Sequence, residues 1–227
     1  MAKSISAGRM KVIYAFLLLF GPALILIFFS TRGCDHKFKE LDDFGQATNY
    51  TFTDASGKKY TSSDFEDKIV LINTIQTTCP DSCAVSMWHL DQLVYQKIRK
   101  NKNEKGSVRI VSFVTDGKGN IVEDLTDVHN MMKDQVEAYD PEVWIIAAGD
   151  SKDIYDFEHN GESLIQTGDE YFGGEGYQEL MLLLDRDNHL RMVLSGKTEG
   201  MIRRMYQHVA LLLKQYDKAA AKKKKGE

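Results

Sequence analysis

The fold is decided by the stretch "KIVLINTIQTTCPDSCAVSMWHL", residues 68–90, where an apolar run gives way to a helical pattern. Its first eight residues are apolar at nearly every position, which predicts a β-strand buried on both faces. Pro80 suits a first helical turn, and the apolar spacing after it predicts a helix that runs to about Asn101. Cys79 and Cys83 lie four positions apart at this junction, so their chemistry is the central question.

The rest of the sequence alternates between strand and helix patterns. In order, these patterns predict a hairpin around the glycine turn at 54–58, a strand at 107–116, a helix at 122–136 and a strand at 143–149. A short helix capped by Asp150 and two strands within 180–194 follow. The closing helix has an apolar face formed by Met201, Met205, Val209 and Leu212. This order predicts parallel strand pairing with helices on both faces, as in a thioredoxin-like α/β domain. The cysteines then follow the carboxyl end of its first central strand, where open α/β sheets usually bind their ligands.

Composition excludes several classes of protein. The chain has 227 residues, 43% hydrophobic and 27% charged, which is ordinary globular composition. Its net charge of −4 and the absence of a basic stripe argue against binding to nucleic acid. Three cysteines are too few for a disulfide scaffold, so a close pair of cysteines is expected to be functional rather than structural.

An apolar segment near the amino terminus predicts a membrane anchor. Residues 12–29, "VIYAFLLLFGPALILIFF", contain no charge, and the predicted transmembrane anchor spans residues 12–31. The basic residues before it place the amino terminus in the cytoplasm by the positive-inside rule. Two alternatives stay open: a cleaved signal peptide, and a lipoprotein signal with Cys34 as the lipidated residue.

The predicted organisation has five parts. These are a cytoplasmic N-terminus at 1–11, the anchor at 12–31, a polar tether at 32–48, a thioredoxin-like domain at 49–217 and a solvated, disordered basic tail at 218–227. Eleven residues before the anchor leave little room for a mitochondrial presequence. We therefore expect a single-pass protein of the bacterial inner membrane with its soluble domain in the periplasm.

The cysteine pair allows two chemistries. Cys79 is expected beside the first turn of a helix, where free amides and the helix dipole stabilise a thiolate. Cys83, one turn further on, shares its face. Two such thiolates can hold a soft ion such as Cu(I), or close a disulfide, because α-carbons one turn apart lie about 6 Å from each other. The CxxxC spacing does not choose between them, and two buried structural cysteines are a third reading.

Five segments resemble the Sco/SenC family in order and spacing. They are "TFTDASGKKYTSSDFEDKIVLI", "TTCPDSC", "RIVSFVTD", "VWIIAAGDSKDIYDF" and "LMLLLDRDNHLRMVLSG", which cover roughly residues 50–215. The most specific is "CPDSC", which matches the CPxxC pattern of the family. The resemblance implies a membrane-anchored thioredoxin-like protein that binds copper and helps to assemble the copper centre of cytochrome c oxidase. It also implies that Cys79 and Cys83 are the copper-binding and redox-active residues.

One family ligand is missing. The resemblance places the third copper ligand, a histidine, eight residues before Asp185, and this chain has Tyr177 there. A phenol is a poor ligand for Cu(I). Met87 could substitute, because its thioether lies one turn after Cys83, although core packing is its ordinary role.

Other possible ligands are weaker candidates. The carboxylates of Glu175 and Glu179 suit Cu(II) better than Cu(I), and a solvated loop is their simpler interpretation. The histidines are scattered and are expected to be surface or core residues: His89, His129, His159, His189 and His208.

Three functions follow from these observations. The first is a Sco-like factor that handles copper, as Cu(I) or Cu(II), or thiol redox, for the copper-bearing subunit of cytochrome c oxidase or for another respiratory complex. The second is a thiol–disulfide oxidoreductase without stable copper binding, since disulfide exchange needs only an accessible thiolate and a resolving partner. The third is a non-catalytic scaffold subunit of a respiratory membrane complex.

Overall fold

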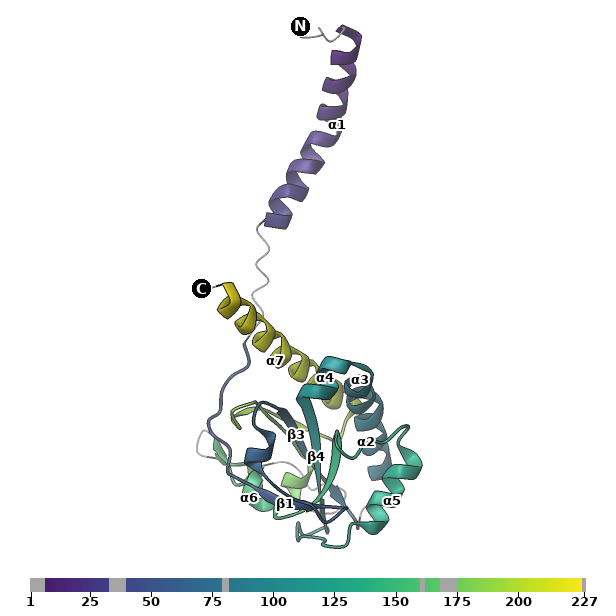
Figure 1. Cartoon of the computed structure of the whole chain (residues 1–227), viewed down its shortest axis with the longest axis vertical. Helices are drawn as coiled ribbons and strands as arrows, with labels where there is room; N and C mark the ends of the chain where they lie inside the picture. Colours follow the sequence, from purple (N-terminus) through teal and green to yellow (C-terminus); the bar gives the residue numbers. More distant parts are fainter. Residues whose placement is uncertain (1–6, 33–39, 79–81, 160–161, 168–174, 226–227) are drawn as a thin grey trace. The chain divides into compact units, whose positions relative to one another are not determined.

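The structure is a computed structural model that describes residues 7–32, 40–78, 82–159, 162–167 and 175–225 (Figure 1). The chain divides into two compact units, Met1–Lys39 and Glu40–Glu227. Every buried hydrophobic side chain among the described residues lies in the second unit. This unit therefore has a complete core of its own and can be tested by itself.

The first unit contains one helix, α1 (Ala7–Arg32), with Pro22 inside it. The transmembrane anchor expected over residues 12–31 is not supported. Among the described residues, no helix has both the length and the apolar character needed to cross a membrane.

The second unit is built on a seven-stranded sheet in the order β2-β1-β5-β4-β3-β8-β9. Its strands are β1 (Thr51–Asp54), β2 (Lys59–Thr61), β3 (Ile69–Gln76), β4 (Val108–Thr115), β5 (Trp144–Ala148), β8 (Leu180–Leu184) and β9 (Leu190–Ser195). The three central strands β3, β4 and β5 are parallel, and β8 pairs antiparallel with β3. A separate two-stranded sheet joins β6 (Glu158–His159) to β7 (Glu162–Ser163).

Helices cover both faces of the sheet. On one face lie α2 (Ser82–Leu90), the π-helical turn η2 (Asp91–Tyr95), α3 (Gln96–Lys100), α4 (Lys102–Ser107), α5 (Thr126–Gln135) and α7 (Glu199–Lys225). The other face is covered by short elements, which are η1 (Ser62–Phe65), α6 (Ser151–Tyr155), η3 (Leu164–Gln166) and η4 (Gly176–Glu179). The predicted mixed α/β fold is confirmed, because full burial of all eight residues of β3 requires cover on both faces.

Some elements differ from the sequence prediction. Helix α5 begins only at Thr126, because Ile121 forms an isolated bridge with Thr115 and the amide of Val122 donates to the carbonyl of Val114, which keeps these two residues beside β4. Met201, expected in the apolar stripe of the closing helix, is 39% exposed. The tail expected to be disordered is helical, since α7 continues to Lys225.

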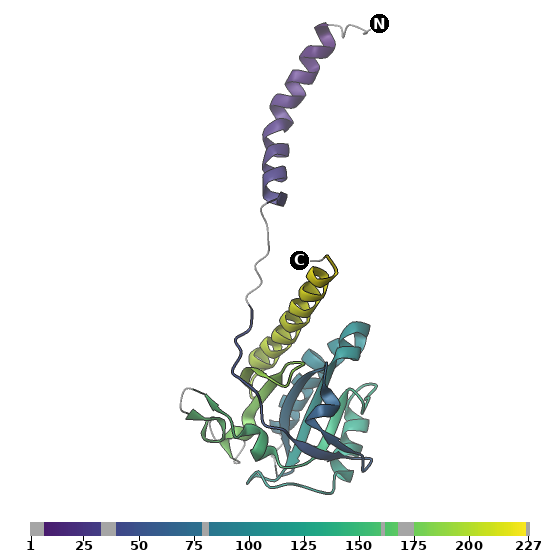
Figure 2. The same cartoon turned by 60° about the vertical axis from the view of Figure 1, so that its left-hand side comes forward.

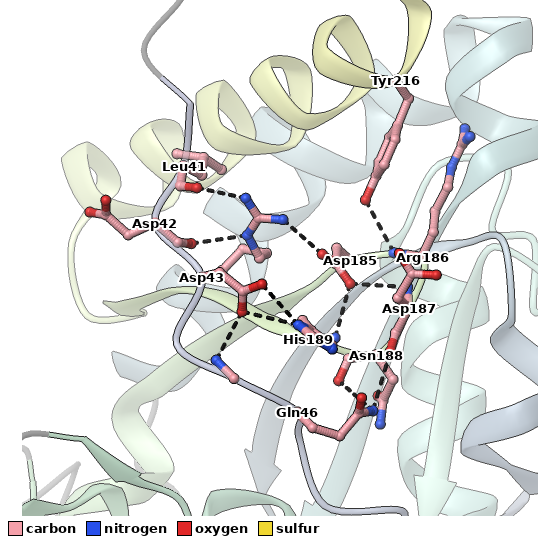
Figure 3. A network of polar contacts seen from close by, with 12 residues as sticks. Leu41, Asp42, Asp43, Gln46, Asp185, Arg186, Asp187, Asn188, His189 and Tyr216 are labelled. Atoms are coloured by element: carbon pink, nitrogen blue, oxygen red, sulfur yellow. Dashed lines mark hydrogen bonds and ion pairs between the residues drawn. The ribbon is translucent and has the colours of Figure 1, made fainter. Parts of the chain in front are cut away.

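The second unit begins earlier than the predicted boundary at residue 49. Residues 41–47, which we call the N-terminal strap, contact the turn between β8 and β9, residues 185–189 (Figure 3). Arg191 donates to the carbonyls of Leu41 and Asp42 at 2.6 and 2.9 Å. The strap is therefore part of the domain rather than of a free tether.

Candidate functional site

The cysteine pair follows the carboxyl end of β3. Cys79 lies outside the described residues, and the backbone of Cys83 lies in the first turn of α2. The strand end before them is fixed, because the amide of Thr77 donates to the carbonyl of Thr115 on β4 at 2.9 Å. The chain therefore leaves the sheet from an anchored position just before Cys79.

A buried glutamine ties the ends of β3 and β4 to η4. The carbonyl of Gln178 accepts from Thr74 Oγ1 at 2.8 Å, and its Oε1 accepts from Thr115 Oγ1 at 2.6 Å. Its Nε2 donates to the carbonyl of Gly117 at 3.2 Å. Gln178 is 2% exposed, so these bonds are shielded from water. We call this arrangement the Gln178 clamp.

The turn at residues 116–120 lies against this clamp and close to the strand end. A Cβ on Gly117 would lie 2.9 Å from Thr78 Oγ1, so only glycine fits there without a shift. Gly119 has a φ of +74°, and a Cβ on it would overlap the hydroxyl of Tyr177. Both glycines are needed for the turn to pack closely against its neighbours.

Tyr177, the residue at the family histidine position, is a buried core residue. It is 1% exposed, its ring lies 5.1 Å from that of Tyr155, and its hydroxyl lies 3.3 Å from Ser151 Oγ. Burial raises the pKa of Tyr177, which makes the phenolate still less available as a ligand. The hydroxyl points to Gly119 and Ser151, so its role is structural.

The two glutamates beside Tyr177 differ from each other. Glu175 is exposed, as expected of a solvated loop. Glu179 is 7% exposed and pairs with Lys197 Nζ at 2.7 Å, so the expectation of a solvated residue is wrong for it. The reason is that Glu179 is the last residue of η4 and directly precedes the buried strand β8, so it lies inside the domain. It lines a small cavity of about 30 Å³ there, together with Ser86 and Met87.

Helix α2 has a buried and an exposed side. Met87 is half-buried and packs on the core, as its ordinary role predicts. Val85 and Trp88 are 55% and 59% exposed, although the sequence pattern placed both among the apolar residues that define the helix. The ring of His89 lies 5.1 Å from that of Trp88.

Two of the other histidines pair with residues that are not metal-ligand candidates in the predicted site. His129 contacts the ring of Tyr139, and burial lowers its pKa. His189 pairs with Asp43 at 2.9 Å, on the strap. Across residues 7–32, 40–78, 82–159, 162–167 and 175–225, no three histidine, cysteine or acidic residues form a cluster that could hold a metal ion.

The sequence did not reveal the Gln178 clamp. Its partners Thr74 and Thr115 lie 104 and 63 positions away in the sequence. A glutamine in a predicted loop carries no local sign of burial. The only available signal was its position next to Tyr177, which the family pattern had already marked.

The chain was compared with known protein families, curated sequences and solved structures. The sequence pattern of the SCO1/SenC family matches residues 39–214. No curated protein sequence matches the chain. A SCO1/SenC family lipoprotein from Bacillus anthracis str. Ames is 22% identical, with a TM-score of 0.50 over 72% of this chain and 95% of its own.

Two further solved structures share the fold. BsSco, a member of the Sco family of cytochrome c oxidase assembly proteins with a disulfide switch, is 17% identical, with a TM-score of 0.50 over 75% of this chain and 97% of its own. ScoI from Arabidopsis thaliana, solved with copper bound, is 17% identical, with a TM-score of 0.50 over 76% of this chain and 100% of its own. At these identities the likeness establishes the fold. Because the family pattern covers most of the 227 residues, the chain belongs to the SCO1/SenC family.

Proposed function

We propose that this chain handles copper through Cys79 and Cys83 during assembly of the copper centre of cytochrome c oxidase. The observation that carries the proposal is a CPxxC cysteine pair, retained directly after the buried strand β3 of a SCO1/SenC domain. Two relatives with the same fold support it, one named for oxidase assembly and one solved with copper bound. The copper-bearing oxidase subunit is the proposed client.

The residues present fit Cu(I) better than Cu(II). Thiolates are soft ligands that favour Cu(I), and a thioether is the next most suitable donor in this chain. Met87 lies one helical turn after Cys83 on α2 and lines the cavity beneath it. We therefore propose a site made of sulfur ligands, with Met87 as the third ligand in place of the family histidine. Tyr177 does not contribute, because its hydroxyl is buried against Gly119 and Ser151.

The burial of Tyr177 also favours a second candidate, thiol–disulfide exchange without stable copper binding. In that reaction the thiols of Cys79 and Cys83 give two electrons and two protons to a client disulfide. The client then carries two thiols, and a Cys79–Cys83 disulfide forms. This chemistry needs no third ligand.

Anaerobic Cu(I) titration of the reduced unit Glu40–Glu227 against a chromophoric chelator tests the first candidate. We expect one tightly bound Cu(I) per chain, lost in Cys79→Ser and in Cys83→Ser. Met87→Leu should weaken binding, while Met192→Leu, which changes another partly buried methionine, is the matched control and should bind like the wild type.

The other outcomes separate the candidates. No tight copper binding, combined with a Cys79–Cys83 disulfide that exchanges readily with glutathione, would favour the thiol oxidoreductase. The absence of both properties would leave a scaffold subunit. Equal copper binding by Met87→Leu and the wild type would remove Met87 from the ligand set.

We also propose that the chain works at the bacterial inner membrane, with the second unit in the periplasm. The support comes from sequence alone: an uncharged segment at 12–29 preceded by basic residues. Carbonate extraction of membranes and protease treatment of spheroplasts test it. Release by carbonate, or protection of the second unit from external protease, would contradict this location.

A further inference from the structure

The carboxyl-terminal part of α7 is basic, and its side chains are exposed as far as the structure describes them, to residue 223. From residue 217 to 223 every side chain is exposed, whereas Val209 and Leu212 before it are fully buried. Four consecutive lysines occupy residues 222–225 at the end of the helix. The negative end of the helix dipole favours cations there, so the charge and the helix stabilise each other. We call residues 218–225 the basic helix end.

The rest of the second unit has the opposite charge. Over residues 40–217, acidic residues clearly outnumber basic ones. An anionic surface would therefore repel the body of the domain and attract the basic helix end. Attraction to such a surface therefore comes from the basic helix end.

Strand pairing defines at which end of the sheet the basic helix end lies. Ser195 at the end of β9 pairs with Leu180, next to η4 and the Gln178 clamp, so α7 begins at the cysteine end of the sheet. At the other end Leu184 pairs with Val70, the second residue of β3. Tyr216 of α7 has reached that end, where its ring lies 4.2 Å from the guanidinium of Arg186. The basic helix end therefore continues past the end of the sheet opposite the cysteines (Figure 2).

The strap joins the domain at the same end. Figure 3 shows residues 41–46 and Tyr216 around one turn, that between β8 and β9. The amide of Arg186 donates to the Tyr216 hydroxyl at 3.3 Å, and Arg191 holds the carbonyls of Leu41 and Asp42. The point where the chain enters the domain and the root of the basic helix end thus share one hairpin.

We propose that the basic helix end binds the anionic headgroups of phospholipids and holds the domain with its cysteine end directed away from the membrane. The lysines attract the headgroups, and repulsion of the acidic body sets the orientation. The strap enters the domain at the same end of the sheet as the basic helix end. Lipid binding does not depend on copper, on the cysteine pair or on α1. A membrane attachment through residues 1–39, as proposed above, would add to it.

Vesicle flotation of the unit Glu40–Glu227 tests the binding. We expect it to bind vesicles of phosphatidylcholine with 30% phosphatidylglycerol and to bind pure phosphatidylcholine at least tenfold more weakly, since each lysine near an anionic surface contributes roughly a fivefold factor. Replacing all four lysines at 222–225 by glutamine should abolish binding. Salt at 0.5 M should do the same to the wild type.

A variant that changes equal charge elsewhere is the matched control. Lys59, Lys100, Lys118 and Lys133 are exposed and lie outside the basic helix end. Their joint replacement by glutamine should change binding less than twofold, and so should Cys79→Ser with Cys83→Ser. If the control loses as much binding as the variant with glutamine at 222–225, or if that variant binds like the wild type, the proposal is overturned.

Two readouts complete the test. Light scattering at low salt should show that the wild type is a monomer. A wild-type dimer that is lost when residues 222–225 are replaced by glutamine would mean that the lysines bind the acidic body of a second copy, which would overturn the proposal. Trp88 reports orientation, because it is exposed on α2 and the other tryptophan, Trp144, is fully buried. Lipids with spin-labelled headgroups should leave Trp88 fluorescence unquenched, and quenching on binding would overturn the orientation.

Discussion

The two ends of the central sheet are held together by different interactions. At the cysteine end, the Gln178 clamp joins η4 to β3 and β4 through neutral amides and hydroxyls that are almost fully buried. At the opposite end, the strap is held by charged groups: His189 pairs with the partly exposed Asp43, and Arg191, which pairs with the buried Asp185, donates to two strap carbonyls. Neutral buried bonds are insensitive to salt and pH, whereas exposed ion pairs are sensitive to both.

This difference has a functional meaning. A redox or copper site must keep its geometry while its own charge changes, so neutral bonds suit the Gln178 clamp beside the proposed site. No such site is proposed at the strap end, where charged groups hold the strap. Substitutions at the two ends test this division.

Gln178→Ala should have the largest effect. It leaves the hydroxyl of Thr115, which is 0% exposed, without its acceptor and frees the carbonyl of Gly117. Urea unfolding should show a loss of about 3 kcal/mol that is the same at 0.1 and 1 M salt. The comparison variant Gln46→Ala, which removes exposed bonds at the strap end, should cost less than about 1 kcal/mol. Equal costs for the two variants would contradict the division.

Arg191→Ala should cost less and should depend on salt. It removes the 2.8 Å pair with Asp185, whose side chain is 4% exposed, and the two bonds to the strap carbonyls. Asp185 still accepts hydrogen bonds from the backbone amides of Asp187 and His189. We therefore expect the free energy of unfolding to fall by about 2 kcal/mol at low salt and by less at 1 M salt. Arg191→Lys keeps the charge but not the forked geometry and should recover part of the loss. A cost that does not change with salt would show that packing dominates.

The pair of His189 and Asp43 should give the smallest effect, visible as a pH dependence. Their hydrogen bond raises the pKa of His189 and lowers the pKa of Asp43. The stabilisation from His189 is therefore complete below about pH 6.5, the unfolded value, and is lost as the pH rises through its folded pKa. Since the side chains are 34% and 50% exposed, it should stay below about 1 kcal/mol.

Urea midpoints at pH 5.5 and 8.5 measure this effect. The wild type should lose stability at the higher pH relative to His189→Asn, which cannot titrate. Asp43→Asn should remove the same pH-dependent part. If His189→Asn shows the same change between the two pH values as the wild type, the strap pair is not its source.

The sequence predicted the strands far better than the contacts between them. The strand over β3 could be recognised because most of its positions are apolar, and the cap of α6 because Asp150 precedes it, where its side chain accepts from the amide of Lys152. Short-range patterns of this kind follow from local physical chemistry. The closing helix was also recognised, although its continuation to Lys225 was not, because four adjacent like charges usually indicate disorder.

The candidate site could be predicted only in part. The CPxxC pair and the substitution at Tyr177 were visible in the sequence. The burial of Glu179 and the Gln178 clamp were not, since both depend on partners brought together by the sheet. The strap was missed for the same reason, because Asp43 and His189 are 146 positions apart. Polar contacts over such separations leave no periodic pattern in a single sequence.

The central claim is that this family member holds copper with sulfur ligands and without the histidine. X-ray absorption spectroscopy of the Cu(I)-loaded unit Glu40–Glu227 tests it most directly. We predict a first shell of sulfur atoms only, with no outer-shell scattering from imidazole, and fewer sulfur neighbours in Met87→Leu. Imidazole scattering in the wild type, or a shell dominated by nitrogen and oxygen, would contradict the account.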